Sequence, residues 1–371
     1  MNTPAQQTRL LSLDTLRGFD MLFIMGGAPL LASLATLLPH PFFQTIAAQM
    51  QHAAWDGLTH HDTIFPLFLF IAGISFPYSL AKQREQGRTS RRIHTKILQR
   101  GITLALLGII YNGLLSLDFE HLRYASVLGR IGLAWMFAAL IYTNTATRTR
   151  LLINASILLG YWLLLAYLPA PDAEGAGPFT IQGSLAGYID RMLLPGRLHM
   201  TIHDPEGLLS TLPAISTALL GMSTGELIRL NRPGLTDRKK VCLLLASSAL
   251  LLLIGLMWNN TFPINKNLWT SSFVCVVGAY SIALFALFYY LIDVLGLQRW
   301  TFFFRIIGLN SITIYMAQQF INFSFTSQAL FGGILRLMPP SAQPLIYWTA
   351  YITVCWTFLY ILYRQRIFLK V

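Results

Sequence analysis

Long apolar segments recur along the whole chain and are separated by short polar or basic stretches. An apolar helix needs about 20 residues to cross the hydrocarbon layer of a membrane. Backbone groups in lipid must be hydrogen-bonded within their own segment, so each spanning segment is a helix. The pattern predicts an all-α polytopic membrane protein with about ten transmembrane helices. The predicted spans are Phe19–Leu38, Thr63–Ala81, Ile97–Leu117, Val127–Tyr142, Leu151–Leu168, Leu208–Ile228, Val241–Trp258, Leu268–Ile292, Phe302–Ile321 and Leu345–Tyr363.

Composition supports a single integral membrane domain over residues 1–371. Hydrophobic residues make up 54% of the chain and charged residues only 11%, whereas soluble domains carry about 25% charged residues. No cleavable signal peptide is expected, because the first ten residues are polar and the first apolar run is long enough to span. The three cysteines all lie inside predicted spans, where we interpret them as small apolar residues.

The net charge of +12 is unevenly distributed. If the N-terminus is cytoplasmic, 21 of the 27 Lys and Arg residues fall on the cytoplasmic side. The other six are Arg123, Arg130, Arg191, Arg197, Lys266 and Arg336. The positive-inside rule then places both termini in the cytoplasm. The charge indicates membrane topology and anionic lipid as a partner, not nucleic acid. A phosphate-binding role for the basic run from Lys82 to Arg100 is the alternative.

Two long loops, residues 39–62 and 169–207, are predicted on the non-cytoplasmic face, and such loops are usually functional or disordered. The first contains three histidines and two acids within eleven residues: His52, Asp56, His60, His61 and Asp62. Histidine exchanges protons near neutral pH, and ionisable groups at a membrane boundary favour a functional role. The alternative is a solvated loop anchored by Trp55. No metal site is expected, because the adjacent His60 and His61 point apart on a helix or strand.

Further polar residues stand at the ends of the predicted spans. Asp204 and Glu206, in the second loop, are expected either to cap the next helix or to bind substrate. Asp14 and Arg17 form either a helix cap with an ion pair or part of a site. Lys266, between two asparagines, suits snorkelling or an anionic or carbonyl ligand. Asn310 lies inside a predicted span, where its side-chain amide needs a hydrogen-bond partner on another helix or on a ligand.

The order of these strings resembles the transmembrane acyltransferases related to heparan-α-glucosaminide N-acetyltransferase, whose bacterial relatives are called NagX-like. The resemblance runs from about Leu11 to the end of the chain. The strings that carry it are Leu13-Asp14-Thr15-Leu16-Arg17-Gly18, His52-Ala53-Ala54-Trp55-Asp56-Gly57-Leu58, Asp62 with Phe65-Pro66, Gly187-Tyr188-Ile189-Asp190-Arg191, Asp204-Pro205-Glu206-Gly207, Asn265-Lys266-Asn267-Leu268-Trp269 and Gly308-Leu309-Asn310-Ser311. The histidine and the Asn-Lys-Asn-Leu-Trp strings are the specific ones.

The resemblance implies that His52 is catalytic. It also implies an acetyl (acyl) group moved from cytoplasmic acetyl-CoA to an amine or hydroxyl of a periplasmic amino sugar or glycan. A bacterial inner-membrane location and a homodimer are implied in the same way. The chain departs from the family pattern at Met25 and Gly129, where many relatives carry Asn and Gln. These departures bear on the identity of the acceptor.

Acyl transfer to an amine or hydroxyl needs a base, and histidine suits this role near neutral pH. We expect His52 to be the base, with Asp62 or Asp56 orienting its ring. An acyl-His52 intermediate is the mechanistic alternative. The oxyanion needs hydrogen-bond donors, for which Lys266, Asn267 and Asn310 are candidates. The expected substrate- and donor-binding set is Asp14, Arg17, Trp55, Arg130, Asp204, Glu206, Lys266, Asn267, Trp269, Asn310 and Ser311.

Two functions from other classes compete with this hypothesis. A permease for amino sugars or other small solutes would use the same intramembrane Asn and Lys residues, but it needs no histidine cluster outside the membrane. A lipid-modifying or scaffold protein without turnover is the third interpretation. Only the acyltransferase consumes a thioester, and it also needs a slot through the bundle, lined by polar residues, along which the donor reaches His52.

Overall fold

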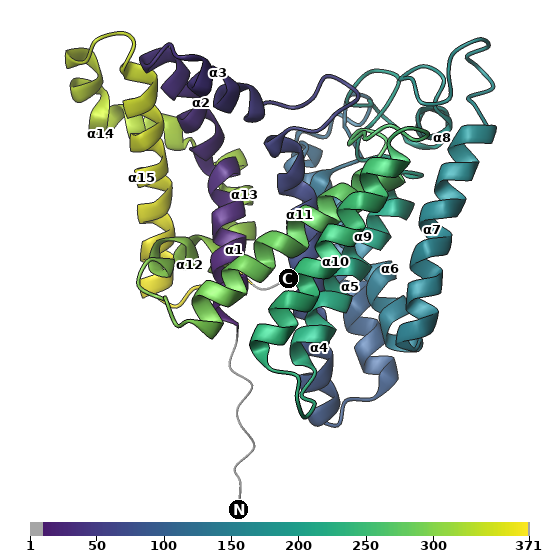
Figure 1. The fold of residues 1–371 in the computed structure, drawn as a ribbon. Helices are drawn as coiled ribbons and strands as arrows, with labels where there is room; N and C mark the ends of the chain where they lie inside the picture. The colour runs from purple at the N-terminus through teal and green to yellow at the C-terminus, as the bar shows by residue number, and fades with distance from the viewer. Residues whose placement is uncertain (1–9, 370–371) are drawn as a thin grey trace, which may run out of the picture.

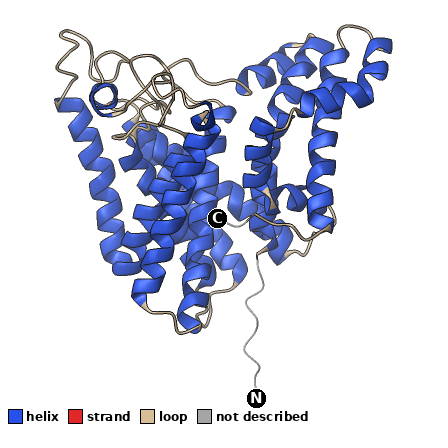
Figure 2. Cartoon of the chain, turned by 180° about the vertical axis from the view of Figure 1, so that it is seen from behind, coloured by secondary structure: helices blue, strands red, loops and turns tan. Residues whose placement is uncertain are grey.

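The computed structural model describes residues 10–369, so Arg9 and Lys370 of the charge count lie outside the described part. Within it the chain is helical, and the one β-type pairing is an isolated bridge between Arg123 and Gly196 (Figures 1 and 2). The helices are α1 Leu11–Leu22, η1 Phe23–Gly27, α2 Ala28–Leu37, α3 Pro41–Gln49, α4 His60–Glu85, α5 Ser90–Tyr111, η2 Leu114–Ser116, α6 Val127–Asn144, α7 Thr147–Tyr167, α8 Leu185–Leu193, α9 Thr211–Arg229, α10 Asp237–Trp258, α11 Ser271–Tyr289, η3 Tyr290–Val294, α12 Thr301–Leu309, α13 Ser311–Phe320, α14 Phe323–Leu337 and α15 Gln343–Arg364.

The chain is an all-helical polytopic membrane protein. Among the described residues, eight helices are long and apolar enough to cross a membrane: Leu11–Leu37, His60–Glu85, Ser90–Tyr111, Val127–Asn144, Thr147–Tyr167, Asp237–Trp258, Ser271–Val294 and Gln343–Arg364. They correspond to eight of the ten predicted spans. The two others, predicted at Leu208–Ile228 and Phe302–Ile321, are α9 and the pair α12 and α13.

Each of these two segments differs from the prediction for a local reason. Helix α9 contains several small polar residues and glycines, which lower its hydropathy and let it pack closely inside the bundle. The other segment is interrupted at Asn310, whose backbone leaves helical geometry (φ −127°, ψ 32°). The segment is therefore two short helices, not one continuous span.

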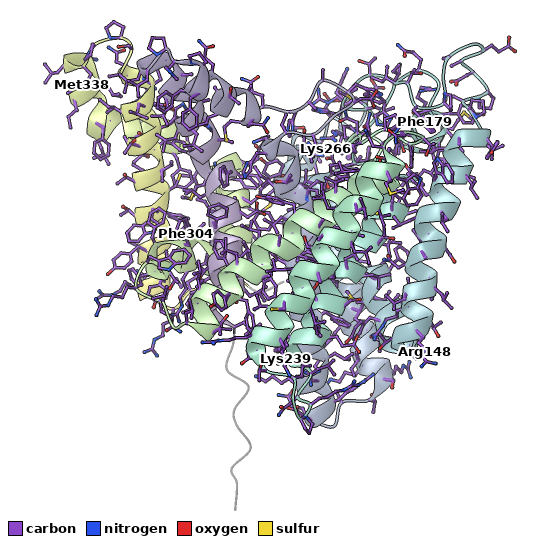
Figure 3. All side chains as sticks on the ribbon, in the orientation of Figure 1. Arg148, Phe179, Lys239, Lys266, Phe304 and Met338 are labelled. Carbon is purple, nitrogen blue, oxygen red and sulfur yellow. The ribbon has the colours of Figure 1, made fainter. Side chains whose placement is uncertain are left out.

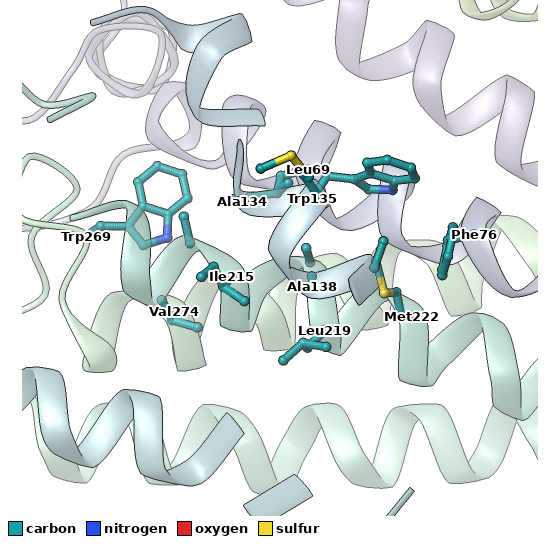
Figure 4. Packing of buried hydrophobic residues seen from close by; sticks show 14 of the residues in the cluster. Leu69, Phe76, Ala134, Trp135, Ala138, Ile215, Leu219, Met222, Trp269 and Val274 are labelled. Carbon is teal, nitrogen blue, oxygen red and sulfur yellow. The ribbon is translucent and has the colours of Figure 1, made fainter. Parts of the chain in front are cut away.

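Close approach of α4 and α9 depends on glycine. A Cβ atom at Gly221 would lie 2.1 Å from the backbone oxygen of Phe70, and one at Gly73 would lie 2.4 Å from that of Ala218. Small residues let membrane helices pack backbone to backbone. Around this contact, side chains from α4, α6, α9 and α11 form one buried cluster that includes Leu69, Trp135 and Leu219 (Figure 4).

The first span is not a straight helix. It contains a π-type turn at Phe23–Gly27, in which Gly26 has a φ of 118°, a conformation that glycine adopts without steric cost. The Gln318 amide donates hydrogen bonds to the Ile24 carbonyl at 3.5 Å and to the Tyr351 hydroxyl at 3.2 Å. The kink is thus held by side chains of α13 and α15, and π-bulges are frequent at functional sites.

The bundle has two distinct ends (Figure 3). Lys266, Phe179 and Met338 lie at one end, which we call the loop end, and Arg148 and Lys239 lie at the other, the basic end. The short helices α3, α8 and α14 lie at the loop end (Figure 1). The loop end carries the two long loops of the sequence, so both regions with candidate chemistry share one face of the molecule.

Candidate active site at the loop end

Asp62 is fixed by the start of helix α4. Its carboxylate accepts hydrogen bonds from the Thr59 N–H at 3.2 Å and the Thr59 hydroxyl at 2.9 Å. The first of these bonds, with the reciprocal contact of the Thr59 side chain and the Asp62 N–H, forms a capping box. The carboxylate also accepts from the Ala53 N–H at 3.1 Å. The side chain is 1% exposed. Capping of this kind satisfies amide groups that the helix cannot pair internally, so the carboxylate has one defined position.

His52 contacts this carboxylate. Its Nδ1 atom lies 2.6 Å from Asp62 Oδ1, and the imidazole is 54% exposed. A carboxylate accepts hydrogen bonds, so the proton of the neutral ring belongs on Nδ1 and the lone pair on Nε2. The arrangement therefore presents a partly solvated ring nitrogen that can accept a proton, with a buried acid behind it.

Lys266 completes the contact from a distant segment, the loop between α10 and α11. Its Nζ atom lies 3.0 Å from His52 Nδ1, 3.4 Å from His52 Nε2 and 3.5 Å from Asp62 Oδ1. Burial lowers the pKa of the Lys266 ammonium, and the carboxylates of Asp62 and Glu206 oppose that shift. One histidine thus lies between an acid and an amine that come from different parts of the chain.

The two other histidines of this loop diverge at the start of α4. The His61 ring lies 4.5 Å from the His52 ring, centroid to centroid, whereas His60 faces α11 and its Nε2 hydrogen-bonds with the Tyr280 hydroxyl at 3.3 Å. Across the described residues, no group of three or more His, Cys, Asp or Glu side chains is placed to hold a metal ion. The absence of a resident metal stays a prediction.

Asp56 does not contact His52 but holds the turn that carries Lys266. Its carboxylate accepts a hydrogen bond from the Asn265 amide at 3.0 Å, and the Asn265 side-chain oxygen accepts from the Leu268 N–H at 2.9 Å. The turn ends at Trp269, whose φ is 53°. The Trp269 indole donates to the Thr217 hydroxyl at 3.3 Å. Of the two acids considered as partners of His52, the structure brings only Asp62 to the ring.

Asp204 and Glu206 bind an arginine and do not cap α9, which begins at Thr211. Both carboxylates pair with Arg123, at 2.6 Å for Asp204, and the Arg123 side chain is 14% exposed. Burial alone would raise the pKa of Asp204, but the hydrogen bonds from Arg123 bring that pKa below its ordinary value. The capping alternative is therefore wrong, because Ser210 is the residue at the start of α9 and four residues, 207–210, separate Glu206 from that helix.

Loop two is anchored to the bundle by Arg130 and Asp190. The buried Arg130 guanidinium, 5.0 Å from the Trp269 ring, donates to the Gly207 carbonyl at 3.1 Å and to the Ser210 hydroxyl. The Asp190 carboxylate accepts from the Leu208 N–H at 2.8 Å. Burial raises the pKa of Asp190 to about 7 in spite of that hydrogen bond. Arg123 and Asp190 were not among the predicted site residues, since the sequence shows them only as a loop charge and part of a motif.

Trp55 and His203 connect the two loops at the loop end. The Trp55 indole donates to the Phe179 carbonyl at 2.9 Å, and its ring lies edge-on to His203, 5.4 Å between centroids. His203 is fully buried, and its Nε2 lies 3.0 Å from the Asn267 carbonyl oxygen. Trp55 and Asn267 therefore link the His52 loop, loop two and the Lys266 turn into one layer.

A cavity of about 560 Å³ lies inside the bundle. Phe65, one helical turn after Asp62, lines it, and so does Ser75 on the same helix. Ten residues of α-helix span about 15 Å, so the cavity runs along α4 from Phe65 toward the basic end. Three arginines from α1, α5 and α12 line it as well: Arg17, Arg100 and Arg305.

Of the predicted residues, Arg17 and Ser311 line this cavity, whereas Asp14 and Asn310 contact residues that line it. Arg17 pairs with Asp14 at 3.5 Å and donates to the Ser75 hydroxyl at 3.3 Å. The Asn310 amide donates to the Ile367 carbonyl at 3.0 Å and its oxygen accepts from the Leu369 N–H at 3.4 Å. Asn310 therefore positions the C-terminal segment at the cavity. Among the three oxyanion candidates, Lys266 is the one in direct contact with His52.

Comparison with known proteins gives two relatives that match most of the chain. Heparan-alpha-glucosaminide N-acetyltransferase of Homo sapiens is 29% identical over 426 aligned positions, which cover 98% of this chain and 60% of the relative. The protein of the same name from Mus musculus is 26% identical, covering 86% of this chain and 56% of the relative. The chain thus spans less than two thirds of the length of either relative. No protein-family model matches the chain.

Proposed function

From its relationship to the transmembrane acyltransferases related to heparan-α-glucosaminide N-acetyltransferase, we propose that the chain is a membrane-bound acetyltransferase. It moves an acetyl group from acetyl-CoA on the cytoplasmic side to an amine or hydroxyl of an amino sugar or glycan on the other side. Under this proposal the loop end faces the periplasm of a bacterium, the basic end faces the cytoplasm, and the enzyme works as a homodimer. The observation that carries the proposal is the His52–Asp62 pair. A cavity lined by three arginines begins at Phe65, one helical turn along α4 from Asp62, and supports the proposal.

The donor occupies the cavity between the two ends. Its phosphates are anionic, and guanidinium groups bind phosphate through charge-assisted hydrogen bonds. The Arg100 guanidinium lies 4.3 Å from the Trp135 ring centre, and its Nε atom is buried without a hydrogen-bond partner among the described residues. A buried donor of this kind costs free energy until it is paired. This supports phosphate binding near Arg100, with the thioester directed toward the loop end.

His52 acts as the general base. The acceptor nitrogen or oxygen attacks the thioester carbonyl, and its proton passes to His52 Nε2 as the new bond forms. The carbon–sulfur bond then breaks, and the thiolate of CoA recovers the proton from the imidazolium. Asp62 keeps Nδ1 protonated and stabilises the imidazolium through their 2.6 Å contact. A base of this kind contributes about 10²–10⁴-fold to the rate.

The developing oxyanion requires a donor near the scissile carbonyl. Lys266 is the best-placed of the three candidates because its ammonium already lies beside His52. An acyl-His52 intermediate is compatible with the same residues, since Nε2 is the nucleophilic atom in that route. In the direct route no acetyl group is found on the protein, so mass spectrometry of protein incubated with acetyl-CoA alone separates the two routes.

Thioester turnover tests the proposed function. Purified protein in detergent or liposomes is mixed with acetyl-CoA and a panel of amino sugars, and both free CoA and acetylated products are measured. We expect release of CoA that depends on the acceptor, with one acetylated product for each CoA. Uptake of an amino sugar into liposomes without CoA release would instead support the permease.

A further inference from the structure

His52 is in contact with two groups of opposite charge. The Asp62 carboxylate lies 2.6 Å from Nδ1, and the Lys266 Nζ atom lies 3.0 Å from Nδ1 and 3.4 Å from Nε2. The distances from Nζ to the two ring nitrogens are similar, and Nδ1 already donates to Asp62. The ammonium therefore lies beside the ring, and its main effect on the imidazole is that of a charge.

The two neighbours act on His52 in opposite directions. A carboxylate within hydrogen-bond distance favours the imidazolium, whereas an ammonium at similar distance favours the neutral ring. A histidine paired with a buried acid alone would be protonated to a greater extent at neutral pH. A base must be neutral before it can take the proton of the acceptor.

We propose that Lys266 is a positioning residue that keeps His52 neutral by balancing the charge of Asp62, and so sets the pH range in which His52 works as a base. This inference rests on the proposed function. It adds Lys266 as the group that controls the protonation state of the base, His52. Lys266 does so from the turn that Asp56 holds through Asn265.

Charged and titratable side chains from two elements contact the His52 ring or its neighbours. Helix α4 contributes Asp62 and His61, and the His61 ring is 4.5 Å away. The turn between α10 and α11 contributes Lys266. Glu206 stabilises the Lys266 ammonium and Arg130 destabilises it, both through electrostatic interaction. Lys266 is the cation that directly contacts both His52 and Asp62.

The chain contains a matched control in His121. Its Nδ1 lies 3.0 Å from the Asp118 carboxylate, and the imidazole is 76% exposed. The pair repeats the histidine–acid contact of the active site, but its partner is a surface acid three residues away. Substitutions at Lys266 should leave the protonation of His121 unchanged, so this residue reports on general effects of pH or folding.

The test measures the charge of His52 directly. Diethyl pyrocarbonate modifies neutral imidazole, so the extent of modification at each histidine, followed by peptide mass spectrometry across pH 5 to 9, gives its protonation midpoint. We expect Lys266→Met to raise the His52 midpoint by about one pH unit or more, within the range typical of a lost neighbouring charge. Lys266→Arg should restore the wild-type midpoint, and Asp62→Asn should lower it.

The outcomes are distinct. An unchanged or lowered His52 midpoint in Lys266→Met, with His121 constant, would overturn the proposal. Lys266→Gln repeats the test if Lys266→Met does not fold. If Lys266 controls the protonation of His52, its loss shifts the acidic limb of the pH–rate profile to higher pH. If Lys266 acts only as an oxyanion donor, its loss lowers the rate by the same factor at every pH. Absence of turnover in the wild type would refute the proposed function. The effect of Lys266 on the protonation of His52 would still be decided by the modification experiment.

Discussion

The carboxylate of Asp62 lies 2.6 Å from the imidazole of His52 and at the same time caps the first turn of helix α4. The position of His52 is therefore tied to the start of a helix that packs against α9 in the bundle core. A rigid element supports the partly exposed ring, which is the arrangement expected of a preorganised site.

Asp62→Asn should reduce turnover while leaving the fold intact. The amide can still accept the Thr59 N–H bond, but it carries no charge to stabilise the imidazolium. We expect a loss of up to about 10²–10⁴-fold, the full contribution of a base. Asp118→Asn is the matched control, because Asp118 pairs with the exposed His121 and not with His52. A greater loss of turnover in Asp118→Asn than in Asp62→Asn would contradict the assignment.

The sequence around Asp62 accounts for its contact with His52, but it does not account for the contact of Lys266 with both residues. Thr59 and Asp62 have the spacing of a capping box, and the histidine string lies just before them. Lys266 is 214 positions from His52. No local periodicity encodes such a pairing, so the sequence named Lys266 as a candidate donor to the oxyanion but did not place it beside His52.

Loop two shows the same limit. Asp204 and Glu206 stand close to the next helix, which made capping a reasonable alternative. Their partner is Arg123, 81 positions from Asp204, and this choice depends on how α6, α8 and α9 pack. The predicted span at Phe302–Ile321 is two short helices for a related reason, because hydropathy does not register the backbone break at Asn310.

Gly221→Ala should destabilise the protein strongly. The added methyl group would meet the Phe70 carbonyl at 2.1 Å in the contact between α4 and α9, and overpacking typically costs about 1–3 kcal/mol. Gly160→Ala, on α7, introduces the same change where no atom lies within 4 Å. We expect a lower melting temperature in detergent for Gly221→Ala and no decrease for Gly160→Ala. Equal melting temperatures would mean that the two helices are not packed as described.

The orientation can be tested by cysteine labelling in whole cells. Cysteines introduced at Gln44 or Glu174 should react with an impermeant thiol reagent, whereas one at Gln86 should react only after lysis. The charge asymmetry of the sequence motivates this expectation. The exposed Cys242 is first replaced by Ser, and the buried Cys275 and Cys355 serve as background. Labelling at Gln86 in intact cells would reverse the proposed topology.

Acetyl-CoA should raise the melting temperature of the solubilised protein, because a ligand that binds only the folded state stabilises it, by about 2.7 kcal/mol at 100 times its Kd. Arg100→Gln should weaken this effect, since Arg100 lines the cavity. Arg148→Gln removes the same charge from the basic end outside the cavity and should not. Equal thermal shifts in Arg100→Gln and Arg148→Gln would show that the donor does not bind in the cavity.

The most direct test of the central claim is acceptor-dependent turnover of acetyl-CoA by His52→Ala and the wild type, measured side by side. The account predicts turnover by the wild type, a loss of about 10²–10⁴-fold in His52→Ala and an unchanged thermal shift with CoA. His61→Ala, which removes the neighbouring ring but not the base, should keep most of the activity. Wild-type turnover in His52→Ala, with activity lost in His61→Ala instead, would contradict the account.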